Sequence, residues 1–131
     1  MSKSYDNTIA MFAEKKQIKK SVMGIVTDSN GVDDPKDPAA PVFQLWNLFA
    51  EADDQKAMAE RARAGGLGYG DVKKDLLERI LDFFSEMRQR REQFESRPDD
   101  VEAILRQGAE KARAMAAPVL EGCRLAAGLG S

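Results

Sequence analysis

Apolar side chains at helical spacing in residues 71–96 constrain the fold more than any other feature of this chain. Their period places them on one side of a helix, so we predict one long helix across this range. Asp71 is suited to open the helix, and Pro98 cannot continue it. The predicted apolar face consists of Val72, Leu76, Leu77, Ile80, Phe83, Phe84 and Met87.

A second long stripe predicts a final helix that begins at Asp99 or Asp100 and runs to Gly128. Pro118 lies inside it and is expected to kink it, because proline lacks the backbone N–H that the helical ladder needs. The apolar face comprises Val101, Ile104, Leu105, Ala112, Met115, Ala116, Val119 and Leu120.

Three shorter helices are predicted before residue 65. Proline is well suited to the first turn of a helix, and glycine to the position that follows its end. Apolar stripes support the first two helices, with Ile18, Val22, Ile25 and Val26 in one and Val42, Leu45, Trp46 and Phe49 in the other. These helices begin at Glu14, at Pro41 and at Asp53 or Asp54, and the third ends at Ala64 before Gly65.

Little of the remaining chain has the pattern of regular structure. Residues 8–12 alternate at period two and predict a short strand, whereas residues 27–40 are rich in proline and aspartate and predict a long connection. The fold class is therefore all-α or nearly so, an amphipathic helical bundle with a short N-terminal loop or strand segment. Trp46 is expected in its core.

Composition excludes several kinds of function. The chain has 131 residues, no histidine and one cysteine, so we expect no zinc site, no bound metal and no internal disulfide. Lysine and arginine number 20 against 22 acidic residues, which predicts that any RNA contact is local. No apolar run is long enough for a membrane span and no secretory signal is readable, so a cytoplasmic location is expected.

Three short motifs could contact phosphate, and each has a simpler explanation. Ser2-Lys3-Ser4 offers a flexible cation and two hydroxyls, but could equally be a polar, frayed terminus. The glycine-rich stretch at residues 66–70 lacks the GxGxxG spacing and suits a tight turn between helices. Arg88, Arg90 and Arg91 form a cationic cluster, yet residues 71–97 hold seven basic and seven acidic side chains, as in a solvated, ion-paired helix face.

Taken together, these segments resemble the C-terminal part of bacterial tryptophanyl-tRNA synthetases. Met1-Ser-Lys-Ser4 resembles the KMSKS signature of class I aminoacyl-tRNA synthetases without its first lysine. The later segments resemble the tryptophanyl family in order and spacing, from residue 1 to about Leu129. They are Ile25-Val-Thr-Asp-Ser29, Pro35-Lys-Asp-Pro38, Val42-Phe43, Leu48-Phe49-Ala50, Gly68-Tyr-Gly-Asp-Val-Lys-Lys74 and Gly108-Ala-Glu-Lys-Ala-Arg113.

The resemblance implies ATP-dependent activation of tryptophan and its transfer to tRNA, with magnesium accompanying ATP in the whole enzyme. Residues 1–13 would form the ATP-phosphate loop and linker, and residues 14–131 a helical domain of the tRNA-binding or anticodon-binding type. Met1, Ser2, Lys3 and Ser4 would contact ATP phosphates, and Lys3 would be the catalytic cation near the departing pyrophosphate. The candidate tRNA contacts are Lys73, Lys74, Arg88 and Arg91.

The same resemblance implies a missing partner. The family's nucleotide-binding fold, histidine-containing motif and tryptophan pocket precede this segment, so we expect the isolated chain to be inactive. It would need that catalytic half, would bind tRNA weakly and would tend to self-associate. The sequence leaves open whether a shortened protein, a truncated gene or an internal start explains its beginning. The alternative interpretation is a free-standing helical binding or assembly module derived from the same family.

Overall fold

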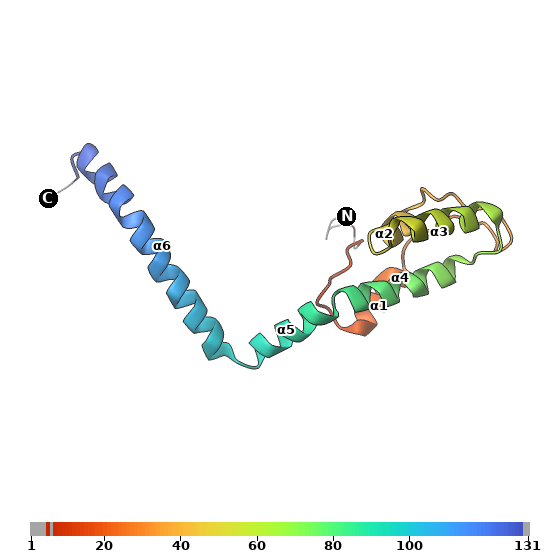
Figure 1. Cartoon of the computed structure of the whole chain (residues 1–131), viewed down its shortest axis with the longest axis horizontal. Coiled ribbons are helices and arrows are strands. Elements are labelled where there is room, and N and C mark those ends of the chain that lie inside the picture. Colours follow the sequence, from red (N-terminus) through yellow and green to blue (C-terminus); the bar gives the residue numbers. More distant parts are fainter. Residues whose placement is uncertain (1–4, 6, 130–131) are drawn as a thin grey trace. The chain divides into compact units, whose positions relative to one another are not determined.

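The computed structural model describes Tyr5 and residues 7–129, and its regular elements there are six helices without a strand. Contacts divide the chain into two compact units, residues 1–88 and residues 89–131. Figure 1 shows the helices in chain order, α1 Lys15–Met23, α2 Pro41–Asn47, α3 Ala52–Ala64, α4 Tyr69–Phe83, α5 Ser85–Glu95 and α6 Pro98–Ala126. The predicted all-α class is confirmed.

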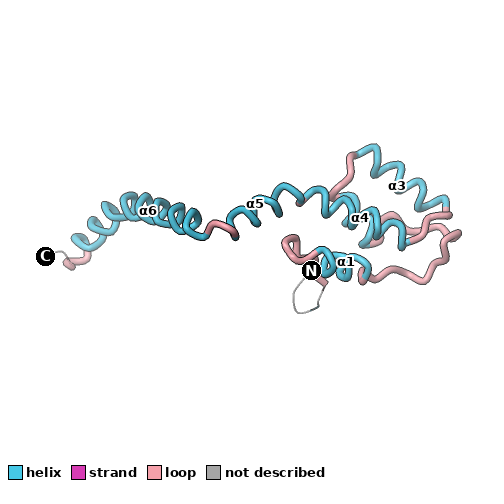
Figure 2. Tube along the Cα trace, turned by 90° about the horizontal axis from the view of Figure 1, so that it is seen from below, coloured by secondary structure: helices cyan, strands magenta, loops and turns pink. Residues whose placement is uncertain are grey.

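The first unit has a small apolar core against α4. Its buried side chains come from α1, α2, α3, α4 and the turn before α4. α1 and α2 pack directly on α4, and Figure 2 shows α1 beside α4. Trp46 is 2% exposed, which confirms its predicted place in the core. The core consists of Ile18, Val22, Val42, Phe43, Trp46, Met58, Ala62, Leu67, Val72, Leu76, Leu77 and Ile80.

The predicted strand at residues 8–12 is wrong. This segment is irregular and ends in a turn, in which the Ala13 N–H donates to the Ala10 carbonyl at 3.1 Å. A strand needs a second strand to satisfy its backbone groups, and the described residues offer none. Ile9 and Ala13 instead pack at the edge of the core.

The helix predicted across residues 71–96 is interrupted at Phe84, between α4 and α5. The backbone bonds on either side of this residue persist, since its N–H donates to the Ile80 carbonyl and its carbonyl accepts from the Arg88 N–H. Phe84 contacts Phe49 and Phe83 edge-on, with ring centroids 6.2 and 5.0 Å away. The interruption therefore lies where an aromatic cluster joins α4 to the segment after α2.

Several predicted helix ends also shift. α1 ends at Met23, which leaves Val26 84% exposed. α3 begins at Ala52 after Glu51, so Asp53 and Asp54 lie in the first turn rather than at the cap, where their charges still suit the positive end of the helix dipole. α6 starts at Pro98, one residue before the predicted range.

α6 belongs to the second unit. It continues through Pro118 and ends at Ala126, two residues before the predicted end. None of its residues is buried in the part of the chain that the structure describes, so the predicted apolar stripe remains exposed. The exposed side chains are Ile104, Leu105, Met115, Val119, Leu120 and Leu125.

Residues 65–68 form the turn from α3 into α4, which confirms the predicted turn in part. Tyr69 and Gly70, also predicted in the turn, lie in α4, so this helix begins two residues before the predicted Asp71. Gly65 has φ +82° and ψ −179°, a conformation open essentially to glycine alone. A Cβ there would lie 2.3 Å from the Asp33 carbonyl oxygen. Gly66 also has positive φ, and its N–H donates to the Val32 carbonyl at 3.0 Å, so the turn is fitted closely against the connection before α2.

Candidate functional site

The signature-like residues Met1, Ser2, Lys3 and Ser4 lie outside the described residues. Their predicted contacts with ATP phosphates, and the catalytic role of Lys3, therefore stay predictions. What the structure describes is the chain that follows them into α1, and the cations that hold it.

Arg88 holds the backbone of residues 11–13, just before α1. Its two terminal guanidinium nitrogens donate to the carbonyls of Met11, at 2.6 Å, and Ala13, at 2.8 Å. The fork geometry of arginine suits such paired acceptors and fixes their direction as well as their distance. Arg88, predicted to contact tRNA, thus holds the backbone immediately before α1.

Lys73 has a similar structural role at the other end of α1. Its ammonium donates to the carbonyls of Ile25 at 2.7 Å and Met23 at 3.2 Å, and the residue is only 9% exposed. The last carbonyls of a helix lack partners within the helix, and a cation is especially favourable there. Lys73 therefore joins the end of α1 to α4, away from the solvent in which a tRNA contact would form.

The other two predicted tRNA contacts lie at the surface. Lys74 pairs with Asp71 at 3.0 Å, and Arg91 pairs with Glu95 at 2.7 Å. All four side chains are more than half exposed, and such pairs contribute roughly 0–1 kcal/mol. They are weak enough to exchange for a phosphate, so for Lys74 and Arg91 the tRNA prediction stands untested.

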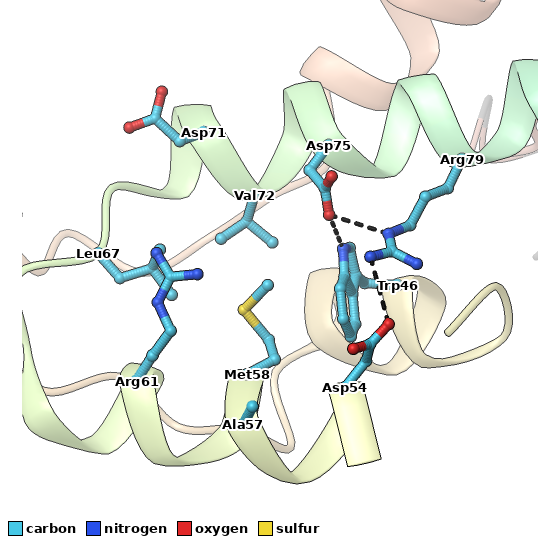
Figure 3. Close-up of a pocket in the computed structure, with 10 residues that line it drawn as sticks. All are labelled: Trp46, Asp54, Ala57, Met58, Arg61, Leu67, Asp71, Val72, Asp75 and Arg79. Atoms are coloured by element: carbon cyan, nitrogen blue, oxygen red, sulfur yellow. Dashed lines mark hydrogen bonds and ion pairs between the residues drawn. The ribbon is translucent and has the colours of Figure 1, made fainter. Parts of the chain in front are cut away.

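A pocket of about 360 Å³ opens between α2, α3 and α4 (Figure 3). Trp46 forms part of its wall, and the Trp46 indole N–H donates to the Asp75 carboxylate. Arg79 donates to the same carboxylate at 3.0 Å and lies 4.4 Å from the centre of the indole ring. The lining residues are Trp46, Asp54, Ala57, Met58, Arg61, Leu67, Asp71, Val72, Asp75 and Arg79.

Arg79 joins three elements at this wall. Besides Asp75 on its own helix, it reaches Asp54 on α3 at 3.7 Å and the Phe49 carbonyl after α2 at 3.2 Å. A guanidinium over an indole face adds roughly 0.5–2 kcal/mol of attraction. The network therefore links α4 to α3 and to the segment after α2. The pocket beside it has an apolar floor, with carboxylates and guanidinium groups at its edge.

A second polar cluster lies where the connection before α2 meets the start of α4. The Tyr69 hydroxyl donates to the Asp28 carboxylate at 2.7 Å. Burial, and then this hydrogen bond, raises the pKa of Tyr69 to about 12, whereas the bond from Tyr69 is the main cause that lowers the pKa of Asp28. The buried Lys36 ammonium lies 5.2 Å from the Tyr69 ring centre and donates to three carbonyls of its own loop.

No protein-family model matches the chain, but it is similar in sequence to several named proteins. It is 47% identical over 130 residues to the tryptophan–tRNA ligase of Rhodopirellula baltica, a match that covers 98% of the chain and 41% of that protein. The corresponding ligase of Pseudomonas aeruginosa is 41% identical over 132 residues, with 100% and 29% coverage.

A solved structure agrees over the same extent. The crystal structure of Campylobacter jejuni tryptophanyl-tRNA synthetase, complexed with ADP and tryptophan, matches with a TM-score of 0.92 and 38% identity. The match covers 98% of this chain and 41% of that one. The chain belongs to the tryptophan–tRNA ligase family. It corresponds to the C-terminal part of these ligases and spans 29–41% of the length of the three proteins compared above.

Within this part of a tryptophan–tRNA ligase, sequence reasoning missed the cations that turn inward. Lys36 binds carbonyls of its own loop, whereas Lys73 and Arg79 bind carbonyls or carboxylates of neighbouring elements. The spacing of Asp75 and Arg79, four residues apart on a helix, was the available signal for one of these contacts. The others depend on loop and helix-end carbonyls, whose positions no sequence pattern indicates.

The described residues offer no group of three or more acidic, cysteine or histidine side chains that could hold a metal ion. Within the same residues, no helix combines the length and the apolar character that a membrane crossing requires.

Proposed function

We propose that this chain supplies the C-terminal part of a tryptophan–tRNA ligase, which activates tryptophan with ATP and transfers it to tRNA. The observation that carries the proposal is similarity over nearly the whole chain, 47% in sequence to one ligase and a TM-score of 0.92 to the structure of another. This similarity favours a ligase segment over a free-standing binding module, because it runs through both units without a break.

In this proposal Met1, Ser2, Lys3 and Ser4 contact the phosphates of ATP, which enters with magnesium in the whole enzyme. Lys3 stabilises the charge that develops on the departing pyrophosphate, so its contact is stronger in the transition state than in the ground state. The two hydrogen bonds from Arg88 to the backbone of residues 11 and 13 support this role, because they hold the chain between the proposed phosphate-binding residues and α1.

The helical part would contact tRNA, weakly when alone, because the net charge of −2 gives no general attraction for RNA. Self-association also stays a prediction. Trp46 is buried in the core of the first unit, as predicted, so it cannot supply the surface for it. The exposed apolar side chains of α6 are the better candidates, and sedimentation of Leu120→Glu against the unaltered chain would test them. A cytoplasmic location and a dimeric whole enzyme are further expectations.

The decisive assay is tryptophan-dependent exchange of pyrophosphate into ATP. We expect no exchange by the 131-residue chain alone, because nothing in it corresponds to the adenosine and tryptophan pockets that the family places before this segment. Adding the preceding part of a closely related ligase in trans should restore exchange. Exchange by the chain alone, or none with the added part, would contradict the proposal.

Lys3→Ala tests the assigned cation in the reconstituted enzyme. If Lys3 acts like a donor to a developing anion, its loss should slow exchange by roughly 10²–10³-fold, or about 2.7–4 kcal/mol. The matched control is Lys56→Ala, which removes an exposed lysine paired only with Asp53 on α3 and should leave the rate unchanged. Equal rates for the two variants would remove Lys3 from this role.

A further inference from the structure

Four lysines of α1 stand out because no described residue pairs with their ammonium groups. All four side chains, those of Lys15, Lys16, Lys19 and Lys20, are exposed, and none of their ammonium groups makes a hydrogen bond or ion pair with a described residue. Glu14 is the only acidic residue between residues 7 and 27. At about 100° per residue, the four side chains share an arc of about 140° on the helix, which leaves Ile18 and Val22 free to face the core.

This arrangement is unfavourable for α1 by itself. Like charges four residues apart repel each other, and the helix contains two such pairs, Lys15 with Lys19 and Lys16 with Lys20. Two of the lysines also lie in the first turn, where the helix dipole disfavours positive charge, and this turn has no acidic residue. The face becomes favourable when a polyanion lies against it.

The charges elsewhere in the first unit point to the same face. Of the cations predicted to contact tRNA there, Lys73 and Arg88 are bound to main-chain carbonyls, and Lys74 is paired with Asp71. Lys73 also places its buried positive charge beneath the end of α1, with no carboxylate among its hydrogen-bond partners. Among the helices that lie wholly in this unit, α1 has four lysines and no acidic residue, whereas the cations of α3 and α4 are matched in number by acidic residues of the same helix, so the excess of positive charge lies on α1.

We propose that the α1 lysine face, defined as Lys15, Lys16, Lys19 and Lys20, is the principal surface through which this chain binds the phosphate backbone of tRNA. The proposal rests on the proposed function for the identity of the RNA. Lysines arranged in this way contact phosphates as flexible point charges and read no base sequence. The apolar residues of α1 at positions 18 and 22 face the core, so the helix has no apolar face to insert into a lipid surface.

The test measures binding of a labelled tRNA transcript that accepts tryptophan to the 131-residue chain, by fluorescence anisotropy over a range of salt concentrations. One variant replaces all four lysines of the face with glutamine. Each lost phosphate contact should lower the slope of log affinity against log salt by roughly 0.7–0.9, so the slope should fall by roughly 3. At the lowest salt, we expect binding to weaken by at least about tenfold.

A control variant removes the same total charge elsewhere. It carries Lys56→Gln, Arg97→Gln, Arg106→Gln and Lys111→Gln, all at exposed positions, and should retain the slope. A third variant with arginine at the four positions of the face should bind like the unaltered chain, because the charges remain. Dichroism and thermal unfolding establish that all three are folded, and removal of like charges should not lower the melting temperature of the glutamine variant.

The proposal is overturned if the face variant keeps the slope, if the control loses as much, or if the unaltered chain does not bind the transcript. Binding of the chain to phosphatidylserine vesicles more tightly than to the transcript would also overturn it. These results are distinct from failure of the proposed function, which would appear as absent pyrophosphate exchange by the unaltered chain with the preceding part.

Discussion

Replacing Lys73 with methionine should destabilise the first unit, although the family resemblance predicts a tRNA contact for this residue. Methionine keeps a long apolar stem for the space that the lysine stem fills, but cannot donate a hydrogen bond. The carbonyls of Met23 and Ile25 would lose the ammonium that now lies 3.2 and 2.7 Å away. The end of α1 would then lose its polar link to α4.

The magnitude follows from the burial of this group. A hydrogen bond to a charged group contributes about 1.5–3 kcal/mol, and Lys73 makes two while only 9% exposed. Part of this gain is offset by removing the ammonium from water, and Met23, itself 37% exposed, can bind water in the variant. We therefore expect a loss of about 2 kcal/mol in the free energy of unfolding. For a unit of this size, that corresponds to a fall of roughly 8–16 °C in melting temperature.

Trp46 makes the measurement specific to the first unit. It is the only tryptophan in the sequence, and its indole lies in the core against Arg79, so its fluorescence reports unfolding there. Urea midpoints should be compared for Lys73→Met and Lys74→Met. The second variant removes an exposed neighbour whose surface ion pair is worth less than about 1 kcal/mol. Equal midpoints for the two variants would refute the structural role of Lys73.

Three further predictions use the same fluorescence or a related probe. Gly65→Ala should lower the free energy of unfolding by more than about 2 kcal/mol, because it adds a steric clash to backbone strain. Gly66→Ala, which has open space for its Cβ, should lower it by about 1 kcal/mol. Equal losses for the two variants would contradict the clash at Gly65. Tyr69 ionises near pH 10 when unfolded and near 12 when folded, so its contribution to stability is complete below pH 10 and is lost towards pH 12. Urea midpoints at pH 9 and 11 check this, and Tyr69→Phe should remove that part of the decline. Arg88→Gln should cost about 1–2 kcal/mol and speed hydrogen exchange in the backbone just before α1, and unchanged exchange there would count against the two hydrogen bonds from Arg88.

Sequence periodicity was sufficient for the helices because their apolar stripes are set by local spacing. The positions that failed are those where a distant residue decides the backbone. Phe84 interrupts the long helix at a cluster with Phe49, thirty-five positions earlier, and residues 8–12 lack a strand partner among the described residues. Neither fact is contained in a window of ten or fifteen residues.

The candidate site was less predictable than the fold, for an electrostatic reason. A sequence gives the number of cations but not the carbonyls to which they donate hydrogen bonds. A count of charged residues does not include the free carbonyls in loops and at helix ends. Lys73 and Lys74 are adjacent and chemically identical, yet one is buried under α1 and the other faces water. Their difference follows from helix rotation against α1, which only the packed structure defines.

The same distinction explains how a chain with net charge −2 can present a positive surface. Acidic residues are spread along α3 to α6, where several pair with cations three or four residues away and cancel locally. Buried cations such as Lys36 and Lys73 are screened by the carbonyls that they bind. Among the described helices, α1 alone has more basic than acidic residues, with four lysines and no acid. This local excess, rather than the sum over the chain, decides where a polyanion is attracted.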